Sequence, residues 1–148
     1  MNDIKRLVGQ FRDAIDRAKK KGEFETYDGF VNFPRGSCGD TSLLLAQFLL
    51  ENDIRTDYVC GTSNNQSHAW LLTDNHNTII DITGDQFEGD PDFLNYDKSV
   101  YVGAEDDFHR LFKGRKIRKN IGLDDFDSEC QSMLKELYSR IIKYIFID

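Results

Sequence analysis

Three thiols are the residues best suited to chemistry in this chain, and their local settings differ. Cys38 stands between Gly36-Ser37 and Gly39-Asp40, immediately before an apolar run that predicts a helix. The unpaired N–H groups and the positive dipole end at the first turn of a helix stabilise a negatively charged sulfur. Because the thiolate is the nucleophilic form of cysteine, Cys38 is the candidate nucleophile.

The other two cysteines are predicted to have packing roles. Cys130 falls on the apolar stripe of a predicted helix, and Cys60 precedes Gly61 in a predicted strand. An odd number of widely spaced cysteines does not suggest a disulfide framework, and no CxxC pair suggests zinc. We therefore expect free thiols, a reducing cytoplasmic location, and no metal or other cofactor.

Only three histidines are available as a base for the thiol. His76 lies in a predicted turn, where exposure to solvent is expected, and His109 could pair with Asp106 or with a helix end. His68 opens a predicted strand, and Trp70, two residues on, shares its face. Elimination favours His68 as the base, although a histidine at such a position, taken alone, is more often structural.

An acid within a predicted strand offers His68 a partner. Asp81 stands among isoleucines in the run 78–83. A charge buried there is costly unless it is paired. If the runs 68–72 and 78–83 are neighbouring strands, the carboxylate can face the imidazole and fix its tautomer. Taken alone, Asp81 fits an exposed sheet face slightly better, so its pairing with His68 is a hypothesis.

These residues lie on elements that predict an α+β fold in a single domain covering residues 1–148. The patterns predict helices over 3–20, 38–51, 106–112 and 124–146, strands over 56–61, 68–72, 78–83 and 99–103, and a loop over 84–98. The helix over 38–51 is apolar on nearly all sides, so it should be buried against a small antiparallel sheet, with the other helices outside. Ser37 and Asp40 suggest a variant of the capping box at its start.

Composition and charge limit the classes of partner that we expect this protein to bind. No apolar run approaches the roughly 20 residues of a membrane span, and the N-terminus has no apolar signal-peptide core. The net charge of −7 argues against a nonspecific nucleic-acid binder. The Lys and Arg residues within 113–119 could hold an anionic partner, but a solvated edge or loop is the simpler interpretation. We expect a soluble cytoplasmic protein without a nucleic-acid or membrane partner.

The stretch from Gly36 to Phe87 resembles the transglutaminase-like core of the papain-like cysteine enzymes. It carries Gly-x-Cys at the head of an apolar helix, a strand ending in glycine, then His-Ala-Trp, and Asp-x-Thr on the next strand. The resemblance implies a papain-like fold with Cys38 as nucleophile, His68 as base and Asp81 as the orienting acid. The family often has Asp-Pro-Thr where this chain has Asp81-Ile82-Thr83.

The resemblance also implies a chemistry, which is attack of the thiolate on an amide carbonyl through a thioester acyl-enzyme. The backbone N–H of Cys38 and one side chain would hold the oxyanion. Asn32, six residues before Cys38, is a candidate donor, although a structural role in its loop is the simpler interpretation. The first functional prediction is hydrolysis of a peptide or other amide, with a peptide or protein as substrate. The alternatives are acyl transfer or glutamine deamidation at the same site, and an idle binding module.

Overall fold

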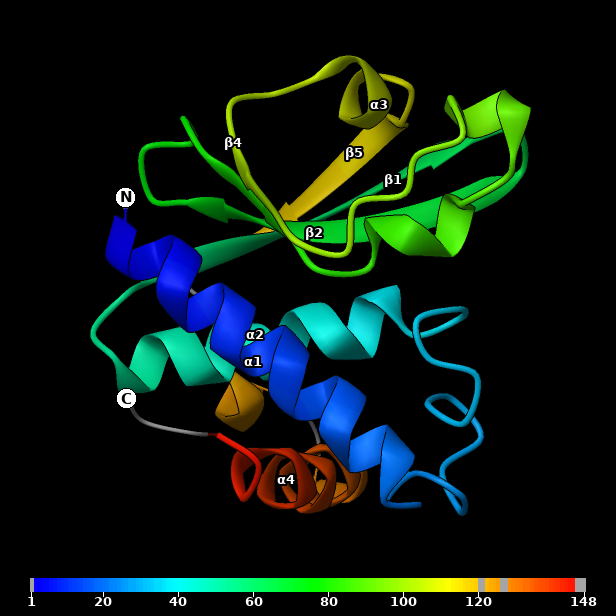
Figure 1. The fold of residues 1–148 in the computed structure, drawn as a ribbon. Helices are drawn as coiled ribbons and strands as arrows, with labels where there is room; N and C mark the ends of the chain where they lie inside the picture. The colour runs from blue at the N-terminus through cyan, green and yellow to red at the C-terminus, as the bar shows by residue number, and fades with distance from the viewer. Residues whose placement is uncertain (1, 120–121, 126–127, 146–148) are drawn as a thin grey trace.

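A five-stranded antiparallel sheet organises the protein within residues 2–119, 122–125 and 128–145, which the computed structural model describes. The strands are β1 (Thr56–Ser63), β2 (Gln66–Thr73), β3 (Ile79–Asp81), β4 (Tyr101–Gly103) and β5 (Lys113–Arg118), in the order β4-β3-β2-β1-β5. Helices α1 (Asn2–Lys20), α2 (Cys38–Glu51) and α4 (Ser128–Ile142) lie below the sheet in Figure 1, and the short α3 (Asp107–Arg110) lies above it. The α+β prediction is confirmed.

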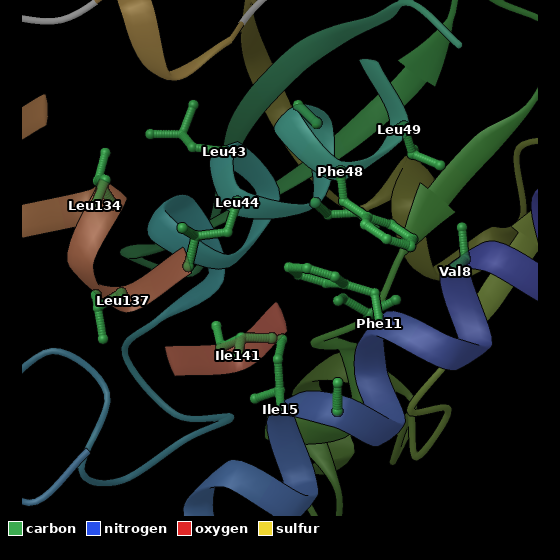
Figure 2. Packing of buried hydrophobic residues seen from close by; sticks show 14 of the residues in the cluster. Val8, Phe11, Ile15, Leu43, Leu44, Phe48, Leu49, Leu134, Leu137 and Ile141 are labelled. Atoms are coloured by element: carbon green, nitrogen blue, oxygen red, sulfur yellow. The ribbon is translucent and has the colours of Figure 1, made fainter. Parts of the chain in front are cut away.

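The helical layer contains the larger hydrophobic core. Leu44, Leu45 and Leu49 of α2 are almost fully buried, as expected for a helix that is apolar on nearly all sides. Figure 2 shows Phe11 of α1 pointing toward Phe48 of α2, and their rings stack with centroids 5.0 Å apart. Helix α2 is therefore enclosed by α1, α4 and the sheet.

The opposite face of the sheet carries a second, aromatic core. It consists of Val59, Trp70, Ile79, Phe87, Phe93, Tyr96, Phe108 and Phe112. Side chains alternate between the two faces of a strand, so Trp70 and Ile79 join this layer while their neighbours Leu71 and Ile80 join the helical core. The same alternation directs His68 and Asp81 to the aromatic side.

Strands β1 and β2 are longer than predicted and form a tight hairpin. Asn64 and Asn65 both have positive φ, 48° and 64°, as in the two-residue turns that match the twist of a hairpin. Ser63 pairs with Gln66 across this turn. Residues 62–67, which lie outside the two predicted strands, therefore belong to the hairpin, because asparagine tolerates the left-handed conformation that its turn requires.

Two predictions about helix ends also need correction. Ser37 precedes α2, but its hydroxyl donates to the carbonyl of Pro34 (3.0 Å) and makes no capping bond, so the proposed capping box is wrong. The predicted helix over 124–146 is shorter in the structure, where a 3-10 turn, η3 (Leu123–Asp125), precedes α4 and α4 ends at Ile142. Residues 126, 127 and 146 of the predicted helix lie outside the described residues.

The remaining predictions concern polar segments. The basic run forms β5, an exposed edge strand, in agreement with the interpretation as a solvated edge. Its charges also discourage pairing with another chain. The segment 84–98 is not a plain loop, because it contains the 3-10 turns η1 (Gly84–Phe87) and η2 (Pro91–Phe93). Among the described residues, no helix has the length and apolar character needed to cross a bilayer.

A buried arginine links the helical layer to η1. Arg12 of α1 is 8% exposed, and its guanidinium forms two hydrogen bonds with Asp85, at 2.8 and 2.9 Å. It also donates to the carbonyl of Ile82 (2.7 Å) and lies over the ring of Phe33. This paired geometry matches the planar fork of arginine to a carboxylate. Arg12 therefore fixes the chain immediately after β3.

We expect Arg12→Met to lower the free energy of unfolding by up to about 3 kcal/mol, because it leaves the Asp85 carboxylate, which is 17% exposed, without its partner. Chemical denaturation monitored by circular dichroism would measure this. The matched control is Arg17→Met on the same helix, whose ion pair with Asp13 is about half exposed on both sides. A change below about 1 kcal/mol is expected for the control. Equal losses in the two variants would contradict the structural role of Arg12.

Candidate active site

Cys38 is the first residue of α2, the helix that lies directly below the sheet (Figure 1). Its thiol is half-buried, and burial opposes ionisation. A hydrogen bond with His68 and the charge of that imidazole outweigh burial, with help from the backbone N–H of Ala69 and the amide of Gln86. The pKa of the Cys38 thiol is consequently lowered from its ordinary value, which favours the nucleophilic form.

His68 is fully buried and makes hydrogen bonds at both ring nitrogens. Its Nε2 lies 2.7 Å from Oδ2 of Asp81, and its Nδ1 lies 2.9 Å from Nε2 of Gln86. Burial lowers the pKa of His68, but the Asp81 carboxylate and the Cys38 sulfur more than compensate and raise it to about 9. The imidazole is therefore a strong base held between the thiol and an acid.

Asp81 ends β3 and is 2% exposed. Leu71 pairs with Ile80 in the β2–β3 ladder, so Asp81 lies next along β3 and diagonally across from His68. Its Oδ1 accepts a hydrogen bond from the backbone N–H of Thr83 (3.0 Å). Burial would raise the pKa of Asp81, but the His68 charge and the hydrogen bonds hold it well below its usual range. The structure thus places Cys38, His68 and Asp81 in one connected series, as the sequence suggested.

His109 is a member of this cluster that sequence reasoning placed elsewhere. Its Nε2 lies 2.8 Å from Oδ2 of Asp81, the same oxygen that faces His68. Its Nδ1 lies 2.6 Å from Oδ1 of Asp106, so the suggested pairing with Asp106 is confirmed. The spacing of three residues signalled that pair, but nothing in the local sequence signalled the contact with Asp81.

Aromatic rings surround the imidazole of His68. The ring centroids of Phe87, Phe112, Trp70 and Phe108 lie 5.1, 5.4, 5.6 and 5.7 Å from it. Such packing excludes water and restricts rotation of the ring. In a site of low dielectric, the interaction of His68 with Asp81 is stronger than it would be in water.

Gln86 is the second residue that the sequence did not single out. It lies on η1, which Arg12 fixes through the adjacent Asp85, and its amide contacts both His68 and Cys38. Gly84 at the start of η1 allows this placement, because a Cβ there would come within 2.4 Å of the ring of Tyr96. Gln86 is therefore rigidly held beside the thiol.

A polar cavity of about 520 Å³ adjoins Gln86. It is lined by Arg35, Gly36, Gln66, Gln86, Phe87, Glu88, Gly89, Asp90 and Pro91. Gly36 adopts a φ of 73°, a conformation that favours glycine, two residues before Cys38. In the described part of the chain, Asn32 has no hydrogen bond to Cys38 or His68 and does not line this cavity. The side-chain amide at the site belongs to Gln86.

The remaining candidates lie in less reactive settings. Burial and the nearby Cys38 charge raise the pKa of the Cys60 thiol. Cys130 packs against the helical core. His76 is exposed in its turn, as predicted, but its Nε2 also pairs with Oδ2 of Asp57 at 2.7 Å.

Three ligand-type atoms converge at the site, namely Nε2 of His68, Oδ2 of Asp81 and Nε2 of His109, all within 4.8 Å of one another. Ligands 2.0–2.1 Å from a tetrahedral zinc ion lie about 3.3 Å apart. The nitrogen–oxygen distances here are 2.7 and 2.8 Å, which are those of hydrogen bonds. We therefore interpret the cluster as a chain of proton donors and acceptors.

Comparison with known proteins adds no relative. The chain matches no family model, no curated protein and no solved structure. The resemblance to the transglutaminase-like core therefore rests only on the motifs of this chain between Gly36 and Phe87.

The thiols are expected to differ in reactivity. Iodoacetamide at pH 6 should alkylate Cys38 faster than Cys60 or Cys130, because His68 lowers the pKa of Cys38 against the effect of burial, whereas burial raises that of Cys60 and Cys130 packs against the helical core. Peptide mass spectrometry of the alkylated protein measures each rate. In His68→Ala the advantage of Cys38 should disappear, whereas His76→Ala, at the exposed histidine, serves as the control and should retain it. Faster labelling of Cys60 in the wild type would contradict the assignment.

Stability should depend on pH through the buried histidines. The pKa of His68, about 9 when folded, exceeds its unfolded value of about 6.5, so its stabilisation is complete below 6.5 and is lost as pH rises through 9. In a Cys38→Ser variant, which removes both the opposing thiol titration and the part of the His68 shift that Cys38 causes, the free energy of unfolding should fall by less than the roughly 3 kcal/mol of the whole shift, because Asp81 supplies the rest. Urea unfolding at several pH values measures the slope. Cys38→Ser/His68→Gln should show a smaller slope, and an equal one would contradict the prediction.

Proposed function

We propose that this protein is a cysteine-dependent hydrolase that cleaves a peptide or other amide bond, built on a papain-like core of the transglutaminase type. The observation that carries the proposal is the series from the half-buried Cys38 thiol through buried His68 to buried Asp81, with the His68–Asp81 hydrogen bond at 2.7 Å. A nucleophile, a base and an orienting acid in this order are the components of acyl transfer.

In the proposed mechanism, Nδ1 of His68 takes the thiol proton, since its Nε2 is engaged with Asp81. The sulfur attacks the amide carbonyl and forms a tetrahedral oxyanion. The imidazolium then protonates the leaving amine, which departs and leaves a thioester on Cys38. Water, activated by His68, attacks the thioester, releases the acid and restores the thiol.

Gln86 is the proposed side-chain donor to the oxyanion, in place of Asn32. In the free enzyme its NH₂ group contacts Nδ1 of His68, at 2.9 Å, and the Cys38 sulfur. As the sulfur attacks, its negative charge moves to the carbonyl oxygen, and the NH₂ group can turn from the sulfur to the oxyanion. The backbone N–H of Cys38, at the first turn of α2, is the second donor.

The test of the proposal is incubation of the purified protein with peptide libraries, followed by mass spectrometry. Shortened peptides from the wild type, absent with Cys38→Ala and His68→Ala, would support hydrolysis. Products that gain the mass of an added amine would support acyl transfer instead. Intact peptides in every mixture, from protein whose Cys38 is reactive toward iodoacetamide, would count against peptide hydrolysis.

Removal of the Gln86 amide should slow catalysis more than it weakens binding. With a substrate from the library, Gln86→Ala is expected to lower kcat by about 10²–10³-fold, the usual loss for one oxyanion donor. Asn32→Ala is the matched control and should retain near-wild-type kcat. If Asn32→Ala shows the larger loss, Asn32 rather than Gln86 is the oxyanion donor.

A further inference from the structure

Asp81 is shared between two histidines, and only one of them faces the thiol. His68 and His109 approach the same oxygen, Oδ2, at 2.7 and 2.8 Å. Both imidazoles are fully buried, and their ring centroids are 6.2 Å apart. The proposed hydrolytic series uses His68 alone, so the second buried histidine requires its own explanation.

The hydrogen-bond partners of His109 define its protonation state. Each of its ring nitrogens lies within 2.8 Å of a carboxylate oxygen, one on Asp81 and one on Asp106. A neutral imidazole has one N–H donor and one acceptor nitrogen, and an acceptor cannot bond a carboxylate. Against the effect of burial, hydrogen bonds lower the pKa of both carboxyl groups, so both are ionised. Both nitrogens must therefore carry protons, which makes His109 a buried cation between two anions.

Asp106 is arranged to maintain that cation. Its Oδ1 also accepts from the backbone N–H of His109 at 2.8 Å, as the N-cap of α3, and its Oδ2 faces the hydroxyl of Tyr96 at 3.4 Å. The Asp106 side chain is 23% exposed, whereas those of His109 and Asp81 are almost fully buried. Asp106 is therefore anchored by the protein while it keeps contact with solvent.

The other groups packed around His109 leave this assignment intact. The rings of Trp70 on β2, of Tyr96 after η2 and of Tyr101 on β4 lie 4.9, 5.9 and 5.5 Å from it. Arg115 of β5 donates to the backbone carbonyl of His109 at 2.7 Å, and its own charge is paired with Glu105. The neighbouring Arg110 is paired with Asp107.

We propose that His109 is a positioning residue, a permanently doubly protonated imidazole that Asp106 holds against Asp81. It fixes the carboxylate oxygen that orients His68, and its positive charge weakens the field of Asp81 at that ring. His68 is thereby prevented from keeping its proton too tightly, so it can act first as base and then as acid. The role in catalysis rests on the hydrolytic function proposed above, whereas the charge state does not.

Two variants separate the charge of His109 from its packing. His109→Gln keeps an N–H donor for Asp81 but removes the cation, and Asp106→Asn leaves the buried ring in place while removing the anion that holds its second proton. Nitrogen-15 NMR of the rings can follow each histidine, because the chain has only three. His76→Ala assigns the exposed one.

The expected result is a wild-type His109 with two ring protons at pH 6–8, and loss of one of them at a lower pH in Asp106→Asn. Deprotonation of His68 should move to higher pH by about two units in His109→Gln, the size expected for a charge removed 6.2 Å away in a buried site. The shift in Asp106→Asn should have the same direction. A buried histidine that only fills space would leave the titration of His68 unchanged.

A singly protonated His109 at pH 7 in the wild type, or an unchanged His68 titration in both variants, would overturn the inference. The measurement uses no substrate. If the NMR result holds while no amide is cleaved, the proposed function fails and the charge assignment stands. If amides are cleaved while His68 titrates identically in the wild type and both variants, the inference about His109 fails and the proposed function stands.

Discussion

The buried carboxylate of Asp81 is the constraint on which the rest of the structure depends. A lone ion in this position would be strongly destabilising, since burial raises the free energy of its charged form. Two imidazoles and the backbone N–H of Thr83 supply its hydrogen bonds. The aromatic layer keeps water away from these contacts. The site is therefore an ionic cluster whose members are each satisfied by another member.

Such a cluster must be positioned by both layers of the fold. The sheet carries His68 and Asp81, the helical layer carries Cys38, and the segment beyond β3 carries Gln86. Arg12 connects α1 to this segment through Asp85 and the carbonyl of Ile82. A change in the packing of helices on the sheet would thus shift the thiol relative to its base.

The charges explain why two histidines and two acids fit in so small a space. Asp106 and Asp81 flank a cationic His109, which leaves one net negative charge to balance the imidazolium of His68. Asp106 also touches solvent, so the cluster is not wholly enclosed. Within this group of two acids and two histidines, His68 is the member that contacts the thiol. The half-buried position of Cys38 gives a substrate access to the sulfur.

Local patterns in the sequence predict the helices and strands and most residues of the candidate site. The apolar run after Cys38 predicts the buried α2, and the short β-rich runs around Trp70 and Ile79 predict strands, because these patterns are local. Elimination among the histidines pointed to His68. Folding brings His109 to Asp81 from 28 residues away and places Gln86, rather than Asn32, beside the thiol. Contacts of this kind depend on the crossing of separate chain segments, which no local pattern records.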